Sequence, residues 1–173
     1  MADTRLSSGT HVYALALGSN RPRSAHRTPA RLIAQAVALI GVEMRVRTVS
    51  PVIVTPPLGP SLRRYANAAM LVESHLEPPA LLRRLQAIET RLGRRRHRRW
   101  GARSIDIDII LWSGGKWRER RLTVPHAAFR ARAFVLTPLS HIAPGWRDPS
   151  SGLAVRHLRA RLEKAKPKRA TRG

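Results

Sequence analysis

The stretch RRRHRRWGARSIDIDIILW (residues 94–112) runs from the most basic part of the chain into a pattern in which isoleucine alternates with aspartate. A period of two is typical of a strand with one buried face, because successive side chains of a strand point to opposite faces. The isoleucines would face the core, while Asp106 and Asp108 would lie together on the other face, about 7 Å apart along the strand. The stretch therefore predicts a strand that packs on one side and carries two carboxylates on the other.

The segments before and after this strand predict a chain in which strands and helices alternate. Strands are predicted over residues 11–20, 43–55 and 65–74, and helices over residues 28–40 and 77–93. The segment 117–126 is predicted as a strand that leads into a loop. Pro51 is expected to break the second of these strands or to place it at an edge of the sheet. The segment 132–144 predicts a short helix or an irregular connection.

Both helices have recognisable ends. Thr28 is an expected N-cap with Pro29 at the first helical position, and Gly41 is the expected stop. The second helix begins with two prolines and is expected to end at Gly93. Its buried stripe consists of Leu81, Leu82, Leu85, Ile88 and Leu92.

Helices separated by strands, with several strands in succession, favour an α+β sandwich over a doubly wound parallel sheet. The sequence contains neither GxGxxG after a strand nor GxxxxGKS/T, which disfavours a Rossmann dehydrogenase and a P-loop nucleotidase. The length of 173 residues predicts one domain, over residues 11–160. An N-terminal extension over residues 1–10 and a basic tail over residues 161–173 would flank it.

The composition is extremely basic, with 33 basic and 10 acidic residues and a net charge of +23. Such a charge leaves open a second interpretation, a nucleic-acid-binding module that uses the arginine-rich segment and the tail. Aromatic residues make up only 5% of the chain, however, which is few for base stacking. This interpretation also leaves the aspartate pair unexplained, since carboxylates repel phosphate unless a metal ion lies between them.

The chain contains no cysteine, which excludes disulfides and thiolate chemistry and makes a reducing cytoplasm the expected compartment. No apolar run approaches the roughly 18 residues that a membrane-spanning helix needs. The start of the chain also lacks the pattern of a secretory signal. We therefore expect a cytoplasmic protein without a membrane partner.

The aspartate pair and the arginines before it are suited to a metal–phosphate site. Mg²⁺ prefers oxygen ligands and often takes only one or two carboxylates, together with water and substrate phosphate. Arginine binds phosphate oxygens through two parallel hydrogen bonds. The alternative is a solvated strand face with two ordinary acids. The neighbouring arginines favour transfer of a phosphoryl group from a nucleotide, in which the protein positions groups and neutralises charge.

Several further segments occur in a fixed order: LGSN near the N-terminus, TPPLGP followed by YANAA, LQAIETRLG, the stretch quoted above, LTVPH (122–126) and RAFVLTPL (132–139). Over residues 12 to about 160 they resemble the 6-hydroxymethyl-7,8-dihydropterin pyrophosphokinases of folate biosynthesis. The resemblance implies a ferredoxin-like α+β sandwich. It also implies transfer of the terminal pyrophosphate of ATP to the hydroxymethyl oxygen of the pterin, with release of AMP.

The resemblance also implies a role for individual residues. Asp106 and Asp108 would hold two Mg²⁺ ions that bridge the ATP phosphates. The phosphates would be contacted by Arg94, Arg96, Arg103, His126 and Arg132, the first two on a mobile loop. The adenosine portion would bind at Gln86, Glu89 and Thr123. The pterin would bind to Tyr65, Asn67, Phe134 and the backbone around Thr55, Pro56 and Leu58, with Trp100 closing the site.

Most of these residues also have a purely structural interpretation. The two aromatic residues could belong to the core, His126 to a surface loop, and Gln86 and Glu89 to an exposed helix face. Asn67 is unfavourable within a strand, which supports a functional role. Arg121 is interpreted as a solvated charge.

Two positions depart from the family pattern. Ala102 stands where the family usually has proline, and HAAF follows Val124-Pro125 without the usual proline or aromatic residue. Neither departure removes a residue named above, which disfavours a relative that has lost catalysis. The expected partners are ATP and the pterin, with no specific nucleic acid, and the expected state is a monomer. Non-specific polyanion binding is a possible side property. No residue is required as the general base, although Asp108 is a candidate.

Overall fold

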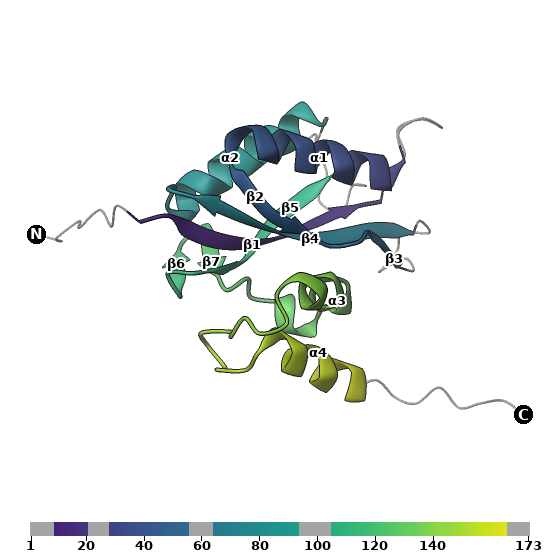
Figure 1. The fold of residues 1–173 in the computed structure, drawn as a ribbon, viewed down its shortest axis with the longest axis vertical. Coiled ribbons are helices and arrows are strands. Elements are labelled where there is room, and N and C mark those ends of the chain that lie inside the picture. Colours follow the sequence, from purple (N-terminus) through teal and green to yellow (C-terminus); the bar gives the residue numbers. More distant parts are fainter. Residues whose placement is uncertain (1–8, 21–27, 56–63, 94–104, 166–173) are drawn as a thin grey trace, which may run out of the picture.

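The computed structural model describes residues 9–20, 28–55, 64–93 and 105–165. A five-stranded antiparallel sheet forms its middle layer. Helices α1 (Pro29–Glu43) and α2 (Pro78–Arg91) cover one face of this sheet (Figure 1). Helix α3 (Ala133–Ile142) covers the other face, with α4 (Val155–Lys164) packed against it. The expected α+β fold, a sheet with helices packed on it, is confirmed.

The order of the strands gives the fold its class. Strand β1 (His11–Ser19) lies between β4 (Tyr65–Ser74) and β5 (Asp106–Trp112), while β2 (Arg45–Val49) and β3 (Ile53–Thr55) pair with different parts of β4. Strand β4 therefore separates β1 from β2, the two strands that α1 connects. This split β–α–β unit, followed by α2 and β5, is the ferredoxin-like arrangement.

Strand β1 contributes large and small side chains to opposite faces. Tyr13, Leu15 and Leu17 are buried in the core beneath α1 and α2, whereas Ala14 packs in the cluster that contains α3. The Tyr13 hydroxyl donates to the Leu76 carbonyl. Burial, with a smaller contribution from the charge of Glu77, raises the pKa of this hydroxyl well above its ordinary value. The face of the sheet toward α3 is thus lined by small residues along β1.

Helix α1 begins as predicted and ends later. The Thr28 hydroxyl accepts a hydrogen bond from the Arg31 N–H, with Pro29 at the first position. The predicted stop at Gly41 is wrong, because the helix continues to Glu43. Glycine in a helix costs only about 1 kcal/mol, and the additional residues bring Met44 into the core.

Helix α2 and the break after β2 agree with the sequence patterns. Gly93 follows α2 with a φ of 87°, a conformation that glycine adopts without strain. Ser50 continues the ladder beyond β2, since its N–H donates to the Ala69 carbonyl at 2.8 Å and its hydroxyl accepts from the Ala69 N–H at 2.9 Å. Pro51 then interrupts the edge strand, as predicted.

The segment 117–126 differs from the prediction of one strand that leads into a loop. It forms a hairpin of β6 (Trp117–Glu119) and β7 (Leu122–Val124), which pair antiparallel around Arg120 and Arg121. Two consecutive arginines are not a recognisable turn signal, so the sequence pattern did not reveal the hairpin. The segment 132–144 forms helix α3, with Pro138 inside it.

The boundary expected at residue 160 remains a prediction; α4 continues to Lys164.

Candidate active site

A pocket of about 350 Å³ lies beside β5, between α2 and the β6–β7 hairpin. Its lining combines carboxylates, an amide, a hydroxyl and an imidazole with aliphatic side chains. The lining residues are Leu82, Gln86, Glu89, Asp106, Ile107, Asp108, Ile109, Arg121, Leu122, Thr123, His126 and Ala127. The structure thus brings together Gln86, Glu89, Asp106, Asp108, Thr123 and His126, all of which the sequence resemblance assigns to a nucleotide and its metal ions.

The two aspartates lie on one face of β5, as the alternating pattern predicts. Ile105, Ile107 and Ile109 are buried on the opposite face, against α1 and α2. Asp106 and Asp108 are partly exposed, and both line the pocket. Their cross-strand neighbours on β1 are Gly18 and Ala16. Because these neighbours are small, β1 places no large side chain next to the two carboxylates.

A β-bulge in β5 positions His126. Residue Ile110 has no partner in the pairing of β5 with β1, which shifts register beside it. The Ile110 carbonyl accepts a hydrogen bond from the His126 backbone N–H at 3.1 Å. This bond ties the segment after β7 to the edge of β5 that faces away from β1, close to the two aspartates.

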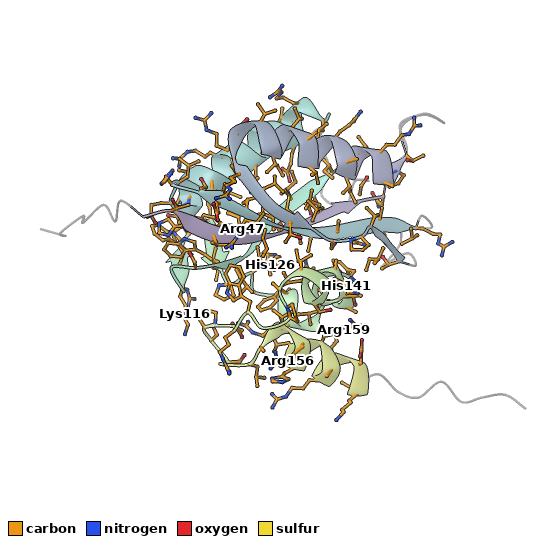
Figure 2. The ribbon with its side chains drawn as sticks, viewed as in Figure 1. Arg47, Lys116, His126, His141, Arg156 and Arg159 are labelled. Carbon is orange, nitrogen blue, oxygen red and sulfur yellow. The ribbon has the colours of Figure 1, made fainter. Side chains whose placement is uncertain are left out.

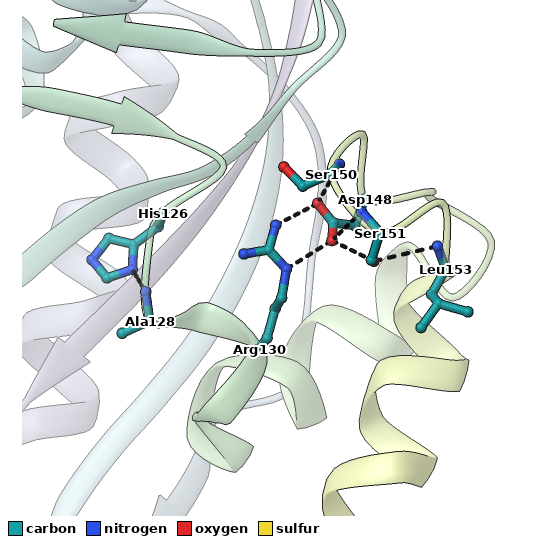
Figure 3. Close-up of polar contacts among 7 residues, drawn as sticks. All are labelled: His126, Ala128, Arg130, Asp148, Ser150, Ser151 and Leu153. Carbon is teal, nitrogen blue, oxygen red and sulfur yellow. Dashed lines mark hydrogen bonds and ion pairs between the residues drawn. The ribbon is translucent and has the colours of Figure 1, made fainter.

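The hydrogen bonds of the His126 ring determine its tautomer. Its Nδ1 accepts a hydrogen bond from the Ala128 N–H at 3.2 Å (Figure 3). In the neutral ring the proton must then be on Nε2. This Nε2 lies 3.9 Å from Asp108 Oδ2. His126 lines the pocket, and the short distance from Nε2 to Asp108 places this donor beside the carboxylates (Figure 2 labels the residue).

Glu89 connects α2 to the same edge of β5. Its side chain is only 2% exposed, and Oε1 accepts a hydrogen bond from the Ile107 N–H at 2.7 Å. A buried backbone N–H needs a partner. The interpretation of Glu89 as an exposed helix acid is therefore wrong. Besides lining the pocket, the residue holds the strand that carries both aspartates.

Replacing Glu89 tests its contribution to the fold. We expect Glu89→Ala to lower the free energy of unfolding by about 2 kcal/mol, because it leaves the Ile107 N–H buried without its acceptor. Glu89→Gln supplies an amide oxygen as the acceptor at the same place and should lower the free energy of unfolding by less than about 1 kcal/mol. Urea denaturation of both variants measures the difference. Equal stability of Glu89→Ala and the wild type would contradict this structural role.

The residues that are expected to bind the pterin lie together at the same face of the sheet as the two aspartates, but on β3, β4 and α3. Tyr65 pairs with Thr55 across β3 and β4, and the Asn67 side-chain amide donates to the Thr55 hydroxyl at 3.0 Å. Asn67 is only 4% exposed. Helix α3, which carries Phe134, packs against β4 and β3. The structure thus places Thr55, Tyr65, Asn67 and Phe134 around the junction of β3, β4 and α3.

Arg132 lies beside Phe134 and does not line the pocket. Its guanidinium carbon is 5.7 Å from the centre of the Phe134 ring, within the range of a cation–π contact. Arg132 is also the residue immediately before α3. Its predicted contact with phosphate remains a prediction.

An ion pair anchors the segment between His126 and α3. Asp148 is fully buried and accepts two hydrogen bonds from the Arg130 guanidinium, each 2.7 Å long (Figure 3). It also accepts hydrogen bonds from the backbone N–H groups of Ser150 and Ser151 and from the Ser151 hydroxyl. The ion pair therefore fixes the short segment from His126 to Arg132 to the loop before α4.

The electrostatics of Asp148 follow from this arrangement. Burial by itself raises the pKa of the carboxyl, but hydrogen bonds from Arg130, Ser151 and Ser150 and the charge of Arg130 outweigh it. Together they lower the pKa of Asp148 from 3.8 to about 2. The carboxylate is therefore charged at neutral pH despite its burial.

Six predicted site residues lie outside the described residues, namely Pro56, Leu58, Arg94, Arg96, Trp100 and Arg103. One residue interpreted as solvated charge, Arg121, lines the pocket. The sequence pattern did not predict the β6–β7 hairpin, and the turn of this hairpin is what brings Arg121 to the pocket beside α2.

The donor set fits magnesium rather than a metal held by protein alone. No group of three or more His, Asp or Glu side chains able to hold a metal ion occurs in the ranges that the structure describes. Two adjacent carboxylates nevertheless match Mg²⁺ bound together with a nucleotide, where phosphate and water supply the remaining ligands.

Within the ranges that the structure describes, no helix is both long and apolar enough to cross a bilayer.

Comparison with known sequences identifies one family. The profile of the family described as 7,8-dihydro-6-hydroxymethylpterin-pyrophosphokinase (HPPK) matches residues 14–144. A 2-amino-4-hydroxy-6-hydroxymethyldihydropteridine pyrophosphokinase of Pseudomonas aeruginosa is 44% identical over 67% of this chain and 70% of its own length. The enzyme of the same name from Haemophilus influenzae is 38% identical over 79% of this chain and 84% of its own length. A Synechocystis relative of that name is 42% identical, but the match covers 51% of its length.

Solved structures with the same fold include larger chains. The structure described as HPPK-DHPS in complex with substrates superposes with a TM-score of 0.72 at 13% identity, over 90% of this chain and 44% of that chain. A Plasmodium falciparum HPPK-DHPS gives a TM-score of 0.71 over 92% of this chain and 47% of that chain. The present chain thus spans less than half of these solved chains, and at such low identity the superposition bears on the fold alone.

Proposed function

The chain belongs to the 7,8-dihydro-6-hydroxymethylpterin pyrophosphokinase family, and from this premise we propose its reaction and its site residues. The reaction transfers the terminal pyrophosphate of ATP to the hydroxymethyl group of 6-hydroxymethyl-7,8-dihydropterin and releases AMP. The product is the pterin diphosphate of folate biosynthesis. This is the reaction that the sequence resemblance implies.

The observation that carries this proposal is the position of the aspartate pair. Asp106 and Asp108 share a pocket with Gln86, Glu89 and Thr123, and His126 lies beside Asp108. The amide and the hydroxyl suit a nucleoside, and the carboxylates suit the metal ions of a triphosphate. In this proposal the adenosine lies between α2 and β7, and the phosphates extend along β5.

Asp106 and Asp108 would hold two Mg²⁺ ions, which neutralise the phosphate charge and orient the chain of phosphates when bound. The Nε2–H of His126 is positioned to donate to a phosphate oxygen next to the carboxylates. Donors that are fixed before the substrate binds stabilise developing charge without reorganising. Two hydrogen bonds hold His126 in place: its backbone N–H donates to the Ile110 carbonyl, and its Nδ1 accepts from the Ala128 N–H.

The transfer is a single displacement at the β-phosphorus. The pterin hydroxymethyl oxygen forms a bond to this phosphorus, and the bond from the phosphorus to the oxygen bridging it to the α-phosphate breaks. That oxygen leaves with AMP, and the hydroxyl proton is released. Asn67, Tyr65 and Phe134 would orient the pterin so that its hydroxyl oxygen is held in line for the attack.

Four residues of the arginine-rich segment complete the proposal, although they lie outside the described residues. Arg94, Arg96 and Arg103 would bind phosphate oxygens, and Trp100 would help to close the site. Arg132 would approach the same phosphates from the start of α3. Closing the site would exclude water and so suppress hydrolysis of ATP.

Product analysis by ³¹P NMR with MgATP and 6-hydroxymethyl-7,8-dihydropterin tests the reaction. We expect the signals of AMP and of a pterin diphosphate to appear together, and only when both substrates and Mg²⁺ are present. Removal of Mg²⁺ with EDTA should stop the reaction. Intact ATP, or hydrolysis to ADP without a new pterin ester, would contradict the proposed function.

The basic surface supports a second, weaker property. Lys116 and Arg156 are exposed at the outside of the molecule (Figure 2), and the net charge is +23. Non-specific binding to polyanions would follow from this charge and would weaken steeply with added salt.

We further propose that the enzyme is monomeric and cytoplasmic.

A further inference from the structure

Gly18, near the end of β1, lies between the two halves of the site. In the sheet it pairs with Asn67 of β4 on one side and with Asp106 of β5 on the other. Residues directly opposite each other in antiparallel strands direct their side chains to the same face. Asn67, Gly18 and Asp106 therefore form one row across the sheet, on the face that carries the site.

The row places no large side chain of β1 between two functional groups. Adjacent strands are about 4.8 Å apart, so the Cα atoms of Asn67 and Asp106 are separated by roughly 10 Å. Gly18 contributes no side chain to the space between them, and it is partly exposed although Leu17 and Ser19 on either side are buried. The next position of β1 on the same face, Ala16, is also small and stands opposite Asp108.

The backbone does not require glycine at this position. Gly18 lies within an extended strand, and the positive φ values in the described part of the chain belong to other glycines. Among the described residues, a Cβ added to Gly18 would come within 4 Å of one atom, the Asn67 Oδ1 at 3.4 Å, which is at the short end of ordinary van der Waals contact. No atom of α3 lies within 4 Å of that Cβ position, so close helix packing does not explain the glycine either. The lack of a side chain at Gly18 therefore leaves space on the surface of the sheet, and no packing contact within the core requires it.

We propose that Gly18 forms the floor over which the pterin lies, and that it determines how closely the substrate's hydroxymethyl group approaches Asp106. This inference rests on the proposed function. A flat bicyclic substrate held at Asn67 must cross the position of Gly18 for its hydroxymethyl group to reach the metal-binding carboxylates. A side chain there would lift the ring from the strand and move the hydroxyl away from the β-phosphorus.

Substitutions of increasing size at Gly18 test the proposal. We expect Gly18→Ala to lower kcat/KM for the pterin by about tenfold and Gly18→Val by about a hundredfold or more, as steric exclusion from a close-fitting site predicts. The affinity for MgATP, measured by isothermal titration calorimetry, should change by less than about twofold, because the nucleoside end of the pocket is formed by α2 and β7. The melting temperature of Gly18→Ala should not fall, since its Cβ fits.

Gly41→Ala is the matched control. It is the same substitution at an exposed glycine of α1, where the added Cβ would lie 3.6 Å from the Val46 side chain and far from the site residues in the fold. We expect its kcat/KM for the pterin to equal that of the wild type. Binding of the pterin alone, followed by its fluorescence, should weaken for both Gly18 variants and remain unchanged for the control.

Two results would overturn the inference. Gly18→Val with kcat/KM for the pterin within about threefold of the wild type would show that the substrate does not lie over Gly18. A parallel loss of MgATP affinity would show general disruption of the site rather than exclusion of the pterin. An inactive wild type would instead contradict the proposed function, and the binding measurement would still decide the role of Gly18 in holding a pterin.

Discussion

Asp106→Asn and Asp108→Asn are each expected to lower kcat for pyrophosphoryl transfer by about a thousandfold or more, with the fold unchanged. Asparagine keeps the size and shape of the side chain but removes the negative charge that would hold Mg²⁺ against the triphosphate. Both aspartates are partly exposed on the pocket side of β5, so neither substitution opens a cavity in the core. AMP formation measured under saturating MgATP and pterin gives the size of the effect.

Glu119→Gln is a suitable control for the loss of charge. Glu119 is exposed on β6 and does not line the pocket. Its replacement should leave kcat within about twofold of the wild type, because exposed charges are well screened. Circular dichroism of all three variants should show the same melting transition. Undiminished turnover in either aspartate variant would rule out the pair as the metal ligands.

Asp148→Asn is expected to have the largest effect on stability, lowering the free energy of unfolding by about 2 to 3 kcal/mol. The substitution removes the charge that pairs with Arg130 and replaces one of its acceptors by a donor. Because the Asp148 side chain is 0% exposed and that of Arg130 is 32% exposed, solvent cannot replace the pair fully. Guanidinium denaturation at neutral pH measures this difference.

The same carboxyl predicts how stability depends on pH. The pKa of Asp148 in the folded protein, about 2, is below the ordinary value of 3.8, so the unfolded chain binds the proton more tightly. The contribution is fully present above about pH 4 and is lost as the pH falls from there toward 2. The stability difference between the wild type and Asp148→Asn should shrink over this interval.

Glu163→Gln provides the comparison for an exposed ion pair. Glu163 pairs with Arg159 one turn away on α4, and its side chain is 53% exposed. We expect it to change the free energy of unfolding by less than about 0.5 kcal/mol. A destabilisation of Asp148→Asn no larger than that of Glu163→Gln would show that the buried pair contributes little.

Local patterns in the sequence predicted most of the elements and the position of Asp106 and Asp108 on one face of β5. The alternation in SIDIDIILW determines which side chains of β5 face the core, because the period of a strand fixes their direction. Thr28 and Pro29 likewise specify the start of α1 through a hydrogen bond within one turn. These features depend on residues close together in the chain, so they can be recognised before any tertiary structure is known.

The features that the sequence did not reveal depend on contacts between distant segments. Glu89 resembles any acid on an amphipathic helix until α2 is placed against the outer edge of β5, where its carboxylate accepts from Ile107. Arg121 enters the pocket only because β6 and β7 form a hairpin. The row that contains Gly18 depends on the register of three strands, and register is set by the whole sheet.

The interrupted border of the sheet has a consequence for behaviour at high concentration. In the described part of the chain, β2 and β3 pair only with β4, so their outer backbone groups are available to a strand from another molecule. Pro51 divides this edge into two short pieces, and the longer one carries the charged and exposed side chains of Arg45 and Arg47, both of which pair with Glu73. Short, charged and proline-interrupted edges disfavour strand addition. The edge formed by β2 and β3, which both pair with β4, thus also protects the folded protein from edge-to-edge aggregation.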